Sequence, residues 1–458
     1  MSEPCDLSAT MARAYIEDGS LSVTTLLESC IARIEERNLV VNAVVATCFD
    51  EARQQARQMD ADRPAMHDLP PLFGLPVLVK DLINTKGLRT TYGSLCFDSH
   101  VPVEDGDVVV ALRDAGAIII GKTNTPEFGA GANTFNKVYG ATRNPHNTDL
   151  TCGGSSGGSA VAVACGMAPL AIGSDFGGSL RIPASFCGIV GMRPTPGRVP
   201  CAQLAVGHSP LWTEGPMARN VGDAALCLSA IEGYRADDPR AAPLDSHSVP
   251  SPVSLAQLNV GVSSDLGLAA LDDDIRAVFQ ECIDKLKPSF ASIETVSPQL
   301  QDAPDVFRTI RILDVFAGTH NLAPDQIELL GDNVKTNIAL AEGISLADVA
   351  RSATTHTRMF KEFQKLFDTH DVLICPATAV SPFPVDQHFP SEMNGKPLDD
   401  YVSWYAITWA LSLMGCPIVT IPVGNDHKGM PFGIQVIAPR HQDQLALNAA
   451  AAIEAHLT

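Results

Sequence analysis

The chain has 458 residues, which at about 100–200 residues per domain allows one large α/β domain or about two to four smaller ones. Hydrophobic residues make up 45% of it and charged residues only 18%, a composition that excludes a disordered chain. Acidic residues outnumber basic ones, 52 to 32, and the net charge of −20 argues against a broad nucleic-acid footprint and against binding to anionic membrane surfaces.

The first predicted elements are a helix and a buried strand. Ser22 is a candidate N-cap for a helix over residues 22–37, where apolar side chains recur at helical spacing. The apolar run at 75–79 follows a proline turn and ends on Lys80, which predicts a buried strand with a lysine at its end. The next helix and strand are expected at 108–115 and 117–120.

Two glycine-rich turns occupy the middle of the chain. The first reads CGGSSGGS at 152–159 and runs into the apolar segment 160–165, which predicts a loop that leads into a buried helix. The second, Gly177-Gly178, follows a strand expected at 170–174. Glycine permits positive φ and lets several N–H groups converge, so each turn is a candidate anion-binding nest, but neither carries the lysine of a phosphate-binding P-loop. Such runs are also common in ordinary loops, so the turns alone leave both interpretations open.

The C-terminal half repeats the alternation of strands and helices. Residues 235–255, rich in proline, aspartate and serine, predict a surface connection that leads into it. Residues 300–350 have helical patterning with few strand signals and are expected to cap a site. Further strands are expected at 258–262, 372–375, 418–421 and 433–437, and further helices at 272–286, 359–367 and 444–455.

These elements predict an α/β fold. Because strand signals recur in both halves, we expect a single domain over 1–458, with a central mixed, mostly parallel sheet covered by helices on both faces. The core segment 70–230 holds the lysine-tipped strand and both glycine-rich turns.

The sequence carries no targeting, membrane or metal signal. The N-terminus has no apolar run of the signal-peptide type, and the most apolar stretch, 160–172, is too short to span a membrane. The 12 cysteines form no C-x-x-C pair and the 12 histidines no H-E-x-x-H motif, so we expect cysteines packed as small hydrophobes and no metal site. These features favour a cytoplasmic protein.

Lys80 is the first candidate catalytic residue. A lysine at the end of a buried strand loses solvation of its charge, and its pKa falls. A neutral amine is able to act as a base toward a serine hydroxyl. An isolated strand-end lysine is more often a solvated tip, so the functional interpretation depends on what accompanies it.

The combination of this lysine with the two glycine- and serine-rich turns resembles the amidase signature family of serine hydrolases. The order of the matching segments is that of the family, and the similarity runs from near residue 8 to the C-terminal helix. The matching segments are LPVLVKD at 75–81, GKTNTPEF at 121–128, GGSSGGS at 153–159, GSDFGGSLRIP at 173–183, FCG at 186–188, GCP at 415–417 and GIQ at 433–435.

The resemblance implies a Ser–Ser–Lys triad. Ser179 matches the nucleophile, Ser155 matches the bridging serine that the family holds on a cis peptide bond, and Lys80 matches the base. It also implies the amidase signature fold and a small-molecule amide as the partner, with no metal and no organic cofactor needed.

The resemblance further implies an oxyanion hole made of backbone N–H groups. These belong to Phe176, Gly177, Gly178 and Ser179. Phe176 departs from the family, which often has a smaller residue such as threonine there, and its ring either narrows the acyl side of the pocket or fills core.

Three polar residues beside the triad are expected to support it. We interpret Asp175 and Arg181 as a pair that holds the turn rather than as substrate contacts, and Ser156 as a hydrogen-bonding residue within its loop.

Two segments are candidates for substrate binding. Gly129, Ala130 and Gly131 match the loop that lines the acyl pocket in the family, and small residues there leave room for a bulky acyl group. Tyr401 and Trp404 lie three residues apart on an expected helix and share a face. This aromatic pair either lines the pocket or packs in the core, and the sequence favours neither.

The resemblance leaves the substrate open among aryl acylamidases, carbamate (urethane) hydrolases and other amidases. We expect a stand-alone enzyme that cleaves an aryl or alkyl amide, with anilides, carbamates and esters as further candidates. The main alternative is the glutaminase subunit of a tRNA-dependent amidotransferase, although the net charge of −20 offers no basic face for tRNA. A non-catalytic amide-binding relative is the alternative of another class, and the intact set of Lys80, Ser155 and Ser179 argues against it. A homodimer is retained as a hypothesis.

Overall fold

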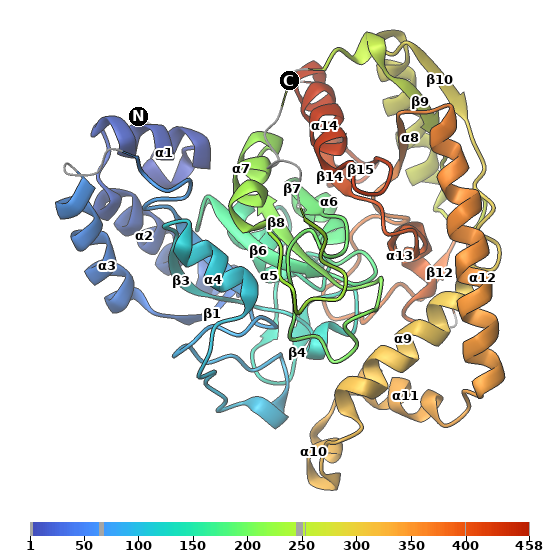
Figure 1. Ribbon diagram of the computed structural model, residues 1–458, viewed down its shortest axis with the longest axis horizontal. Helices are drawn as coiled ribbons and strands as arrows, with labels where there is room; N and C mark the ends of the chain where they lie inside the picture. The colour runs from blue at the N-terminus through green and yellow to red at the C-terminus, as the bar shows by residue number, and fades with distance from the viewer. Residues whose placement is uncertain (1–2, 64–67, 244–250, 252, 399, 458) are drawn as a thin grey trace.

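An eleven-stranded mixed sheet runs through the computed structural model, which describes residues 3–63, 68–243, 251, 253–398 and 400–457 (Figure 1). From one edge to the other its strands are β1 (Val44–Thr47), β3 (Ile118–Thr123), β2 (Pro76–Lys80), β6 (Leu170–Asp175), β8 (Thr213–Ala218), β7 (Val190–Arg193), β14 (Ile418–Asn425), β15 (Pro431–Ile437), β11 (Val372–Pro376), β9 (Asn259–Val262) and β10 (Ser292–Thr295). Two small two-stranded sheets pair β4 (Phe135–Asn136) with β5 (Gly140–Ala141) and β12 (Glu392–Met393) with β13 (Lys396–Pro397).

Helices cover the sheet and close both ends of the molecule. In chain order they are α1 (Ala9–Asp18), α2 (Val23–Val41), α3 (Phe49–Asp62), α4 (Asp107–Asp114), α5 (Gly157–Ala164), α6 (Arg181–Cys187), α7 (Val221–Ile231), α8 (Asp273–Leu286), α9 (Ala303–Thr319), α10 (Pro324–Leu329), α11 (Asp332–Ala341), α12 (Leu346–Gln364), α13 (Ala406–Leu413) and α14 (Asp443–Leu457). In Figure 1 the N-terminal helices α1–α3 lie at one end, and α9, α11 and α12 form the opposite side.

The pairing of the strands is parallel in two runs and antiparallel between them. Strands β3, β2 and β6 are parallel to one another, and so are β11, β9 and β10. The strands between β6 and β11 pair antiparallel, as does β1 with β3. The predicted α/β fold with a mixed sheet flanked by helices is therefore confirmed. Parallel pairing, which was expected for most of the sheet, is confined to the two runs of three strands, and the other six pairings are antiparallel.

The helices and strands expected from hydrophobic periodicity are present, with some different ends. Ser22 caps α2 by accepting a hydrogen bond from the Thr25 N–H at 3.0 Å, and α2 ends where Asn42 adopts a left-handed φ of 51°. The buried helix expected at 160–165 begins earlier, since α5 starts at Gly157 inside the segment interpreted as a loop.

The predicted connection at 235–255 is only partly described. Its residues 244–250 and 252 lie outside the described residues, and residues 236–240 form turns. The segment 300–350 is helical as expected, since it contains α9, α10, α11 and the start of α12.

The N-terminal helix is tied to the body of the protein by one buried carboxylate. Asp223 of α7 is fully buried and accepts hydrogen bonds from the N–H groups of Ala9 and Thr10 at 2.8 and 2.9 Å. It also accepts a hydrogen bond from the Thr10 hydroxyl at 2.9 Å. The start of α1 is thus satisfied by a side chain more than 200 residues away.

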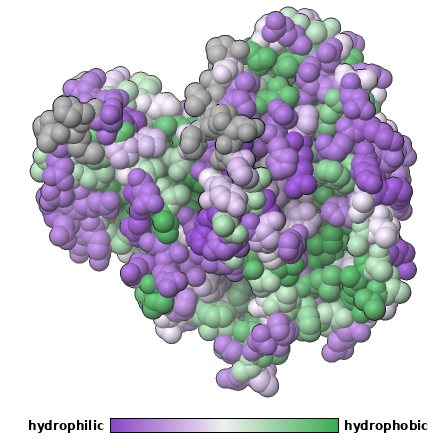
Figure 2. All heavy atoms as spheres, viewed as in Figure 1, coloured by the Kyte–Doolittle hydropathy of each residue, from purple (hydrophilic) through white to green (hydrophobic). Residues whose placement is uncertain are grey.

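The composition of core and surface agrees with the sequence. All 12 cysteines are free thiols, and those other than Cys48 and Cys96 are buried, as expected. No helix among the described residues combines the length and the hydropathy that a membrane crossing requires. Figure 2 shows hydrophilic and hydrophobic side chains interspersed over one face, and Leu313 and Phe316 of α9 are exposed.

Candidate active site

Lys80 stands at the centre of a buried polar cluster. It is the last residue of β2, and its side chain is completely buried. Its Nζ donates hydrogen bonds to the Oγ atoms of Ser155 at 2.7 Å, Ser156 at 2.9 Å and Ser174 at 3.0 Å. The prediction of a buried lysine at a strand end is confirmed, and the solvated-tip alternative is excluded.

Burial also changes the protonation of this lysine. Removal from water lowers the pKa of Lys80 to about 7, against the opposing effects of the Asp175 and Glu214 carboxylates. Its three neighbours are hydroxyls, which neutralise no charge. Near neutral pH the amine is therefore partly neutral and able to accept a proton.

Ser155 lies in the glycine-rich loop that precedes α5. The peptide bond between Gly154 and Ser155 is cis, as the resemblance implies. The loop leaves little space for side chains, because a Cβ on Gly157 would lie 2.3 Å from Oγ1 of Thr134. Position 157 therefore requires glycine, because Thr134 approaches its backbone too closely for a Cβ.

Ser156 joins the two glycine-rich turns. Its hydroxyl donates to the carbonyl of Ser174 at 3.0 Å and accepts from the Ser174 N–H at 3.2 Å. Its own N–H donates to the carbonyl of Ser179 at 3.1 Å. The expected supporting role of Ser156 thus includes both turns as well as Lys80.

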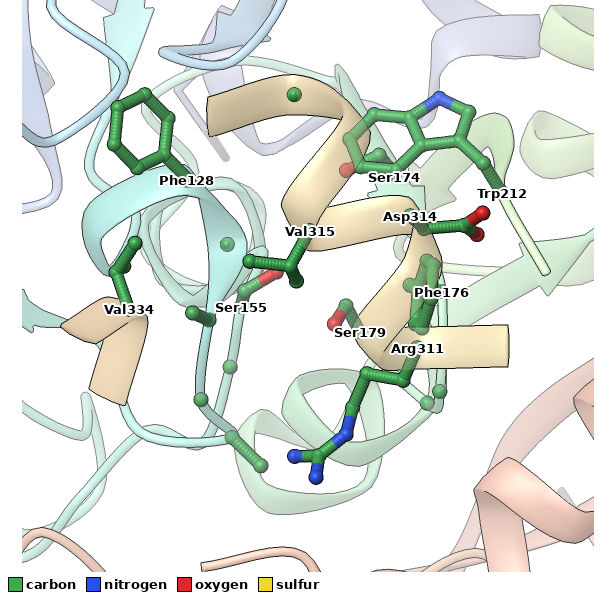
Figure 3. Close-up of a pocket in the computed structure, with 18 of the residues that line it drawn as sticks. Phe128, Ser155, Ser174, Phe176, Ser179, Trp212, Arg311, Asp314, Val315 and Val334 are labelled. Atoms are coloured by element: carbon green, nitrogen blue, oxygen red, sulfur yellow. The ribbon is translucent and has the colours of Figure 1, made fainter. Parts of the chain in front are cut away.

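Ser179 lies in the turn between β6 and α6, and its exposed fraction is 9%. Ser179 and Ser155 line the same cavity, where their side chains are drawn together in Figure 3. The structure therefore brings together all three residues of the predicted triad. Ser155 and Ser179 share the cavity, and Lys80 is hydrogen-bonded to Ser155.

The N–H groups of the nucleophile turn are not all available to a substrate. The Gly178 N–H already donates to Oδ1 of Asp175 at 3.0 Å, and its place in the oxyanion hole stays a prediction. The N–H groups of Phe176, Gly177 and Ser179 have no hydrogen-bond partner among the described residues. These three remain candidates to bind an oxyanion.

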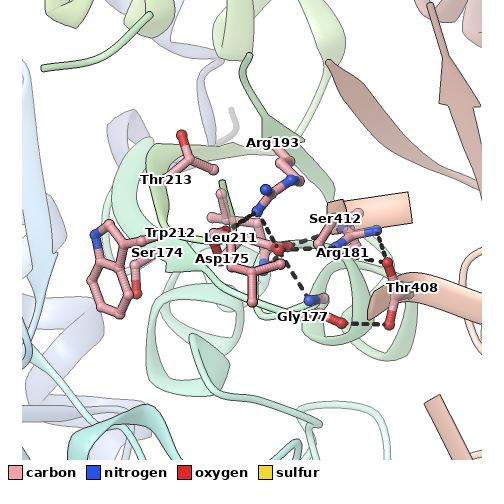
Figure 4. A network of polar contacts seen from close by, with 12 residues as sticks. Ser174, Asp175, Gly177, Arg181, Arg193, Leu211, Trp212, Thr213, Thr408 and Ser412 are labelled. Atoms are coloured by element: carbon pink, nitrogen blue, oxygen red, sulfur yellow. Dashed lines mark hydrogen bonds and ion pairs between the residues drawn. The ribbon is translucent and has the colours of Figure 1, made fainter. Parts of the chain in front are cut away.

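Asp175 holds this turn through two buried arginines (Figure 4). Arg181 donates to both carboxylate oxygens at 2.9 and 3.0 Å, and Arg193 donates to Oδ1 at 2.9 Å. Burial alone would raise the pKa of Asp175, but the charges of Arg181 and Arg193 outweigh it and hold that pKa well below its usual range. The interpretation of Asp175 and Arg181 as a pair that supports the turn is confirmed.

Arg181 also connects the turn to the C-terminal part of the sheet. It donates to the Thr408 carbonyl and the Gln435 side chain, each at 2.8 Å, and to Ser412. Thr408 in turn donates to the Gly177 carbonyl at 2.7 Å. The position of the nucleophile turn therefore depends on residues that are far apart in the sequence.

Ser155 and Ser179 open into one cavity of about 260 Å³. The predicted residues Gly129, Ala130, Gly131 and Tyr401 lie on its wall. Helix α9 of the predicted cap contributes further side chains; that this segment acts as a cap stays a prediction. The lining residues that sequence reasoning missed include Trp212, Phe307, Arg311, Asp314, Val315 and Val334.

Of the two alternatives for Trp404, the structure favours the core, and Trp404 is not a wall residue of the cavity. Trp404 is 1% exposed and lies outside the cavity, stacked on Phe186 with ring centroids 6.4 Å apart. The α-helix expected to carry both Tyr401 and Trp404 begins only at Ala406, after a short 3₁₀ turn. The two side chains therefore do not share a helix face.

Two carboxyl groups near the cavity have raised pKa values. Burial raises the pKa of Asp314 to about 6, against the effect of a hydrogen bond from Ser209. Burial likewise raises the pKa of Glu214 to about 7. Asp314 lines the cavity, whereas Glu214 lies in β8.

One group among the described residues has the geometry to hold a metal ion, and it is remote from the triad in sequence. It consists of Glu3, Cys5 and Asp6. Arg33 forms ion pairs with both of its carboxylates, at 2.8 and 3.0 Å, which gives them a partner already.

Comparison with known proteins identifies relatives over nearly the whole chain. The model of the Amidase family matches residues 25–447. A glutamyl-tRNA(Gln) amidotransferase subunit of Koribacter versatilis is 33% identical, with 98% of each chain covered. An acylamidase of Rhodococcus erythropolis is also 33% identical, with 98% of this chain and 95% of the other covered. The crystal structure of a bacterial aryl acylamidase of the amidase signature family superposes with a TM-score of 0.91 at 27% identity, covering 98% of this chain and 96% of that one.

Proposed function

Because the chain belongs to the amidase signature family of amidohydrolases, we propose that it cleaves the C–N bond of a linear carboxylic amide through an acyl-enzyme on Ser179. Ser155 and Lys80 form the proton relay. The observation that carries the proposal is the completely buried Lys80, with a pKa of about 7, whose Nζ contacts Ser155 at 2.7 Å beside the cavity that Ser179 lines.

The first step forms the acyl-enzyme. Neutral Lys80 takes the proton of the Ser155 hydroxyl, and Ser155 takes the proton of Ser179. The oxygen of Ser179 attacks the carbonyl carbon and forms a tetrahedral intermediate with a negatively charged oxygen. The unpartnered N–H groups of Phe176, Gly177 and Ser179 are the donors for that oxygen.

The second step releases the amine and then the acid. The C–N bond breaks as the proton held on Lys80 returns through Ser155 to the departing nitrogen. Water then gives a proton to the same relay and attacks the ester of Ser179. The bond between the acyl carbon and Oγ breaks, the carboxylic acid leaves, and the Ser179 hydroxyl is restored.

The shape of the cavity supports a stand-alone amidase for an aryl or alkyl amide. Its walls carry the aromatic rings of Phe128, Phe176, Phe307 and Trp212, which suit an apolar substrate body. The loop of Gly129 to Gly131 leaves room beside Ser155. An acyl-enzyme mechanism extends to anilides, carbamates and esters, because each has a carbonyl carbon with a leaving group.

A glutaminase component of an amidotransferase is the second candidate. The observation that favours it is the 33% identity to the glutamyl-tRNA(Gln) amidotransferase protein of Koribacter versatilis, which equals the identity to the acylamidase. In that case the ammonia released from glutamine would pass to a partner protein.

Amine release from a small panel tests the proposal. The substrates are an aryl anilide, a primary aryl amide, an aryl carbamate and glutamine, each assayed with the wild type and with Ser179→Ala. We expect the wild type to turn over an aryl substrate and Ser179→Ala to be inactive. Ser292→Ala, which removes an exposed hydroxyl from the edge strand β10, is the matched control and should retain activity.

The other outcomes separate the alternatives. Turnover of glutamine alone indicates the amidotransferase component. Undiminished turnover in Ser179→Ala contradicts the assignment of the nucleophile. No turnover of any substrate by a folded wild type favours a non-catalytic relative.

A further inference from the structure

Arg311 is a buried cation on the wall of the catalytic cavity. It projects from α9, lines the same cavity as Ser155 and Ser179, and is 9% exposed. Its guanidinium forms no ion pair in the part of the chain that the structure describes, unlike Arg181 and Arg193 of the nucleophile turn. A charge that is buried without a counter-ion is costly, so its retention needs an explanation.

The hydrogen-bonding capacity of Arg311 is largely unused. Its Nη1 donates to the hydroxyl of Tyr401 at 2.9 Å, which is the single hydrogen bond of the guanidinium among the described residues. Its Nε is buried and has no partner there. The guanidinium is held by the rings of Phe307 and Tyr401, with centroids 5.9 and 5.4 Å away, and these rings leave its N–H donors free.

The hydroxyl of Tyr401 is a second free donor at the same place. It accepts hydrogen bonds from Arg311 and from Nδ2 of Asn337, each at 2.9 Å. A phenol oxygen with two incoming hydrogen bonds still has its own proton to donate. Tyr401 also lines the cavity, so its O–H and the guanidinium are donors that lie side by side.

Asp314, whose carboxyl group lines the cavity, is not a counter-ion for Arg311. Asp314 is one turn further along α9, accepts a hydrogen bond from Ser209, and forms no ion pair with Arg311 among the described contacts. In Figure 3 the Asp314 carboxylate and the Arg311 guanidinium point away from one another. The end of the cavity at Arg311 thus offers hydrogen-bond donors to an incoming acceptor.

We propose that Arg311 and the Tyr401 hydroxyl bind a carboxylate carried by the substrate, so that the preferred substrates are amides bearing a free carboxylate. The planar guanidinium matches a carboxylate in geometry and charge, and the apolar walls between it and Ser179 suit the carbon chain or ring that joins the two groups. The proposal names the substrate class of the proposed amidase and rests on that function.

Matched pairs of substrates test it. The monoamides of straight-chain dicarboxylic acids with four to eight carbons are compared with the corresponding diamides, by ammonia release. For at least one chain length we expect the wild type to have a kcat/KM at least about 10-fold higher for the monoamide. Arg311→Gln should lower kcat/KM for that monoamide by about 10- to 100-fold, mainly through KM, since a charge-assisted hydrogen bond is lost. The diamide should change by less than about 3-fold.

Two control variants distinguish a loss of carboxylate binding at Arg311 from a general structural effect of the substitution. Arg308→Gln removes the same charge from an exposed position of α9, and should leave both substrates unchanged. Arg311→Lys keeps the charge and should restore part of the preference. An equal loss for monoamide and diamide in Arg311→Gln, or a wild type that prefers the diamide at every length, overturns the proposal.

Direct binding keeps this test independent of turnover. Calorimetry with the dicarboxylates themselves is run on Ser179→Ala and on Ser179→Ala combined with Arg311→Gln. Binding to the first protein and at least about 10-fold weaker binding to the second supports the carboxylate site, even where neither amide is hydrolysed and the proposed function fails. Equal binding to both proteins, or binding to neither, contradicts it.

Discussion

At the scale of single residues, the proposed proton relay depends on whether the amine of Lys80 is protonated. A free lysine is protonated at neutral pH, but complete burial lowers the pKa of Lys80 to about 7. The three hydroxyls around its Nζ give the amine a fixed position without a counter-charge. Lys80 is therefore poised to exchange protons with Ser155 near neutral pH.

This protonation predicts the pH dependence of the reaction. Below pH 7 Lys80 is mostly protonated and cannot accept a proton, so kcat/KM should fall; it should rise through about pH 7 and level off above it. The measurement is the pH profile of kcat/KM for the wild type, Lys80→Ala and Lys80→Arg. Both variants should lose at least about 100-fold in activity and the rise near pH 7 with it. A variant that keeps the wild-type profile would exclude Lys80 as the base.

Sequence reasoning located the triad and missed much of the pocket. Lys80, Ser155 and Ser179 lie in contiguous segments whose residue types are distinctive, so their roles followed from the resemblance. Arg311 and Asp314 lie in an ordinary amphipathic helix, and only its packing against the glycine-rich turns makes them wall residues. The sequence left open whether Trp404 lines the pocket or packs in the core, and its stacking on Phe186 places it in the core.

At the element scale, the turn between β6 and α6 is built around one carboxylate. Asp175 accepts from the Gly178 and Leu180 N–H groups, both at 3.0 Å, and from two buried arginines. These contacts fix the backbone that carries Ser179 and its three free N–H groups. The same contacts give the Gly178 N–H a partner within the turn.

Removing this carboxylate should destabilise the protein. Asp175→Asn leaves Arg181 and Arg193 buried without a counter-ion, which we expect to lower the free energy of unfolding by about 3–5 kcal/mol. Urea denaturation compares it with Asp305→Asn, an exposed carboxylate on α9. An unfolding midpoint for Asp175→Asn equal to that of the wild type would contradict the role assigned to the pair.

The lowered pKa of Asp175 also determines how its contribution to stability changes with pH. The pKa of Asp175 is held below its unfolded value, so its stabilisation is present above that value and disappears as the pH falls through the lower, folded pKa. The stabilisation that Asp175 gives to the folded protein should therefore be complete above the pKa of an unfolded aspartate. It should be lost only as the pH falls through the lower, folded pKa.

Hydrophobic periodicity predicted seven strands of the large sheet, but it missed β8 and β7 in the middle and β1 and β10 at the edges. Strand β8 reads TEGPMA, and glutamate, glycine and proline are depleted in strands, yet all its residues are buried between β6 and β7. Its identity as a strand comes from its neighbours, which sequence patterning does not include. The glycines of the first turn were interpreted as loop, although Gly157 already begins α5.

On the scale of the whole molecule, one buried side chain couples the two ends of the first 230 residues. Asp223 of α7 receives three hydrogen bonds from the start of α1, and nothing in the local sequence of either helix indicates this contact. The sequence predicted a single α/β domain because strands recur along it. The strand order could not be predicted, since it is determined by contacts between distant segments.

This contact predicts a global effect with little change at the active site. Asp223→Ala removes hydrogen bonds to a buried carboxylate and should lower the free energy of unfolding by at least about 2 kcal/mol. The kcat of the folded protein should stay within about 2-fold of the wild type, because the triad lies on other elements. Urea denaturation measures the free energy of unfolding, and kcat is measured at urea concentrations too low to unfold the protein. Asp284→Ala, on the exposed face of α8, is the control for both measurements. An unchanged midpoint would show that α1 contributes nothing to global stability.

The most direct test of the proposed acyl-enzyme is to find the acyl group on Ser179. The wild type is mixed with an activated aryl ester or anilide, quenched in acid within the first turnover, digested and analysed by mass spectrometry. We expect an acyl mass increment on the peptide that contains Ser179, and none in Ser179→Ala. An increment on Ser155 or another residue, or turnover of the substrate by Ser179→Ala, would contradict it.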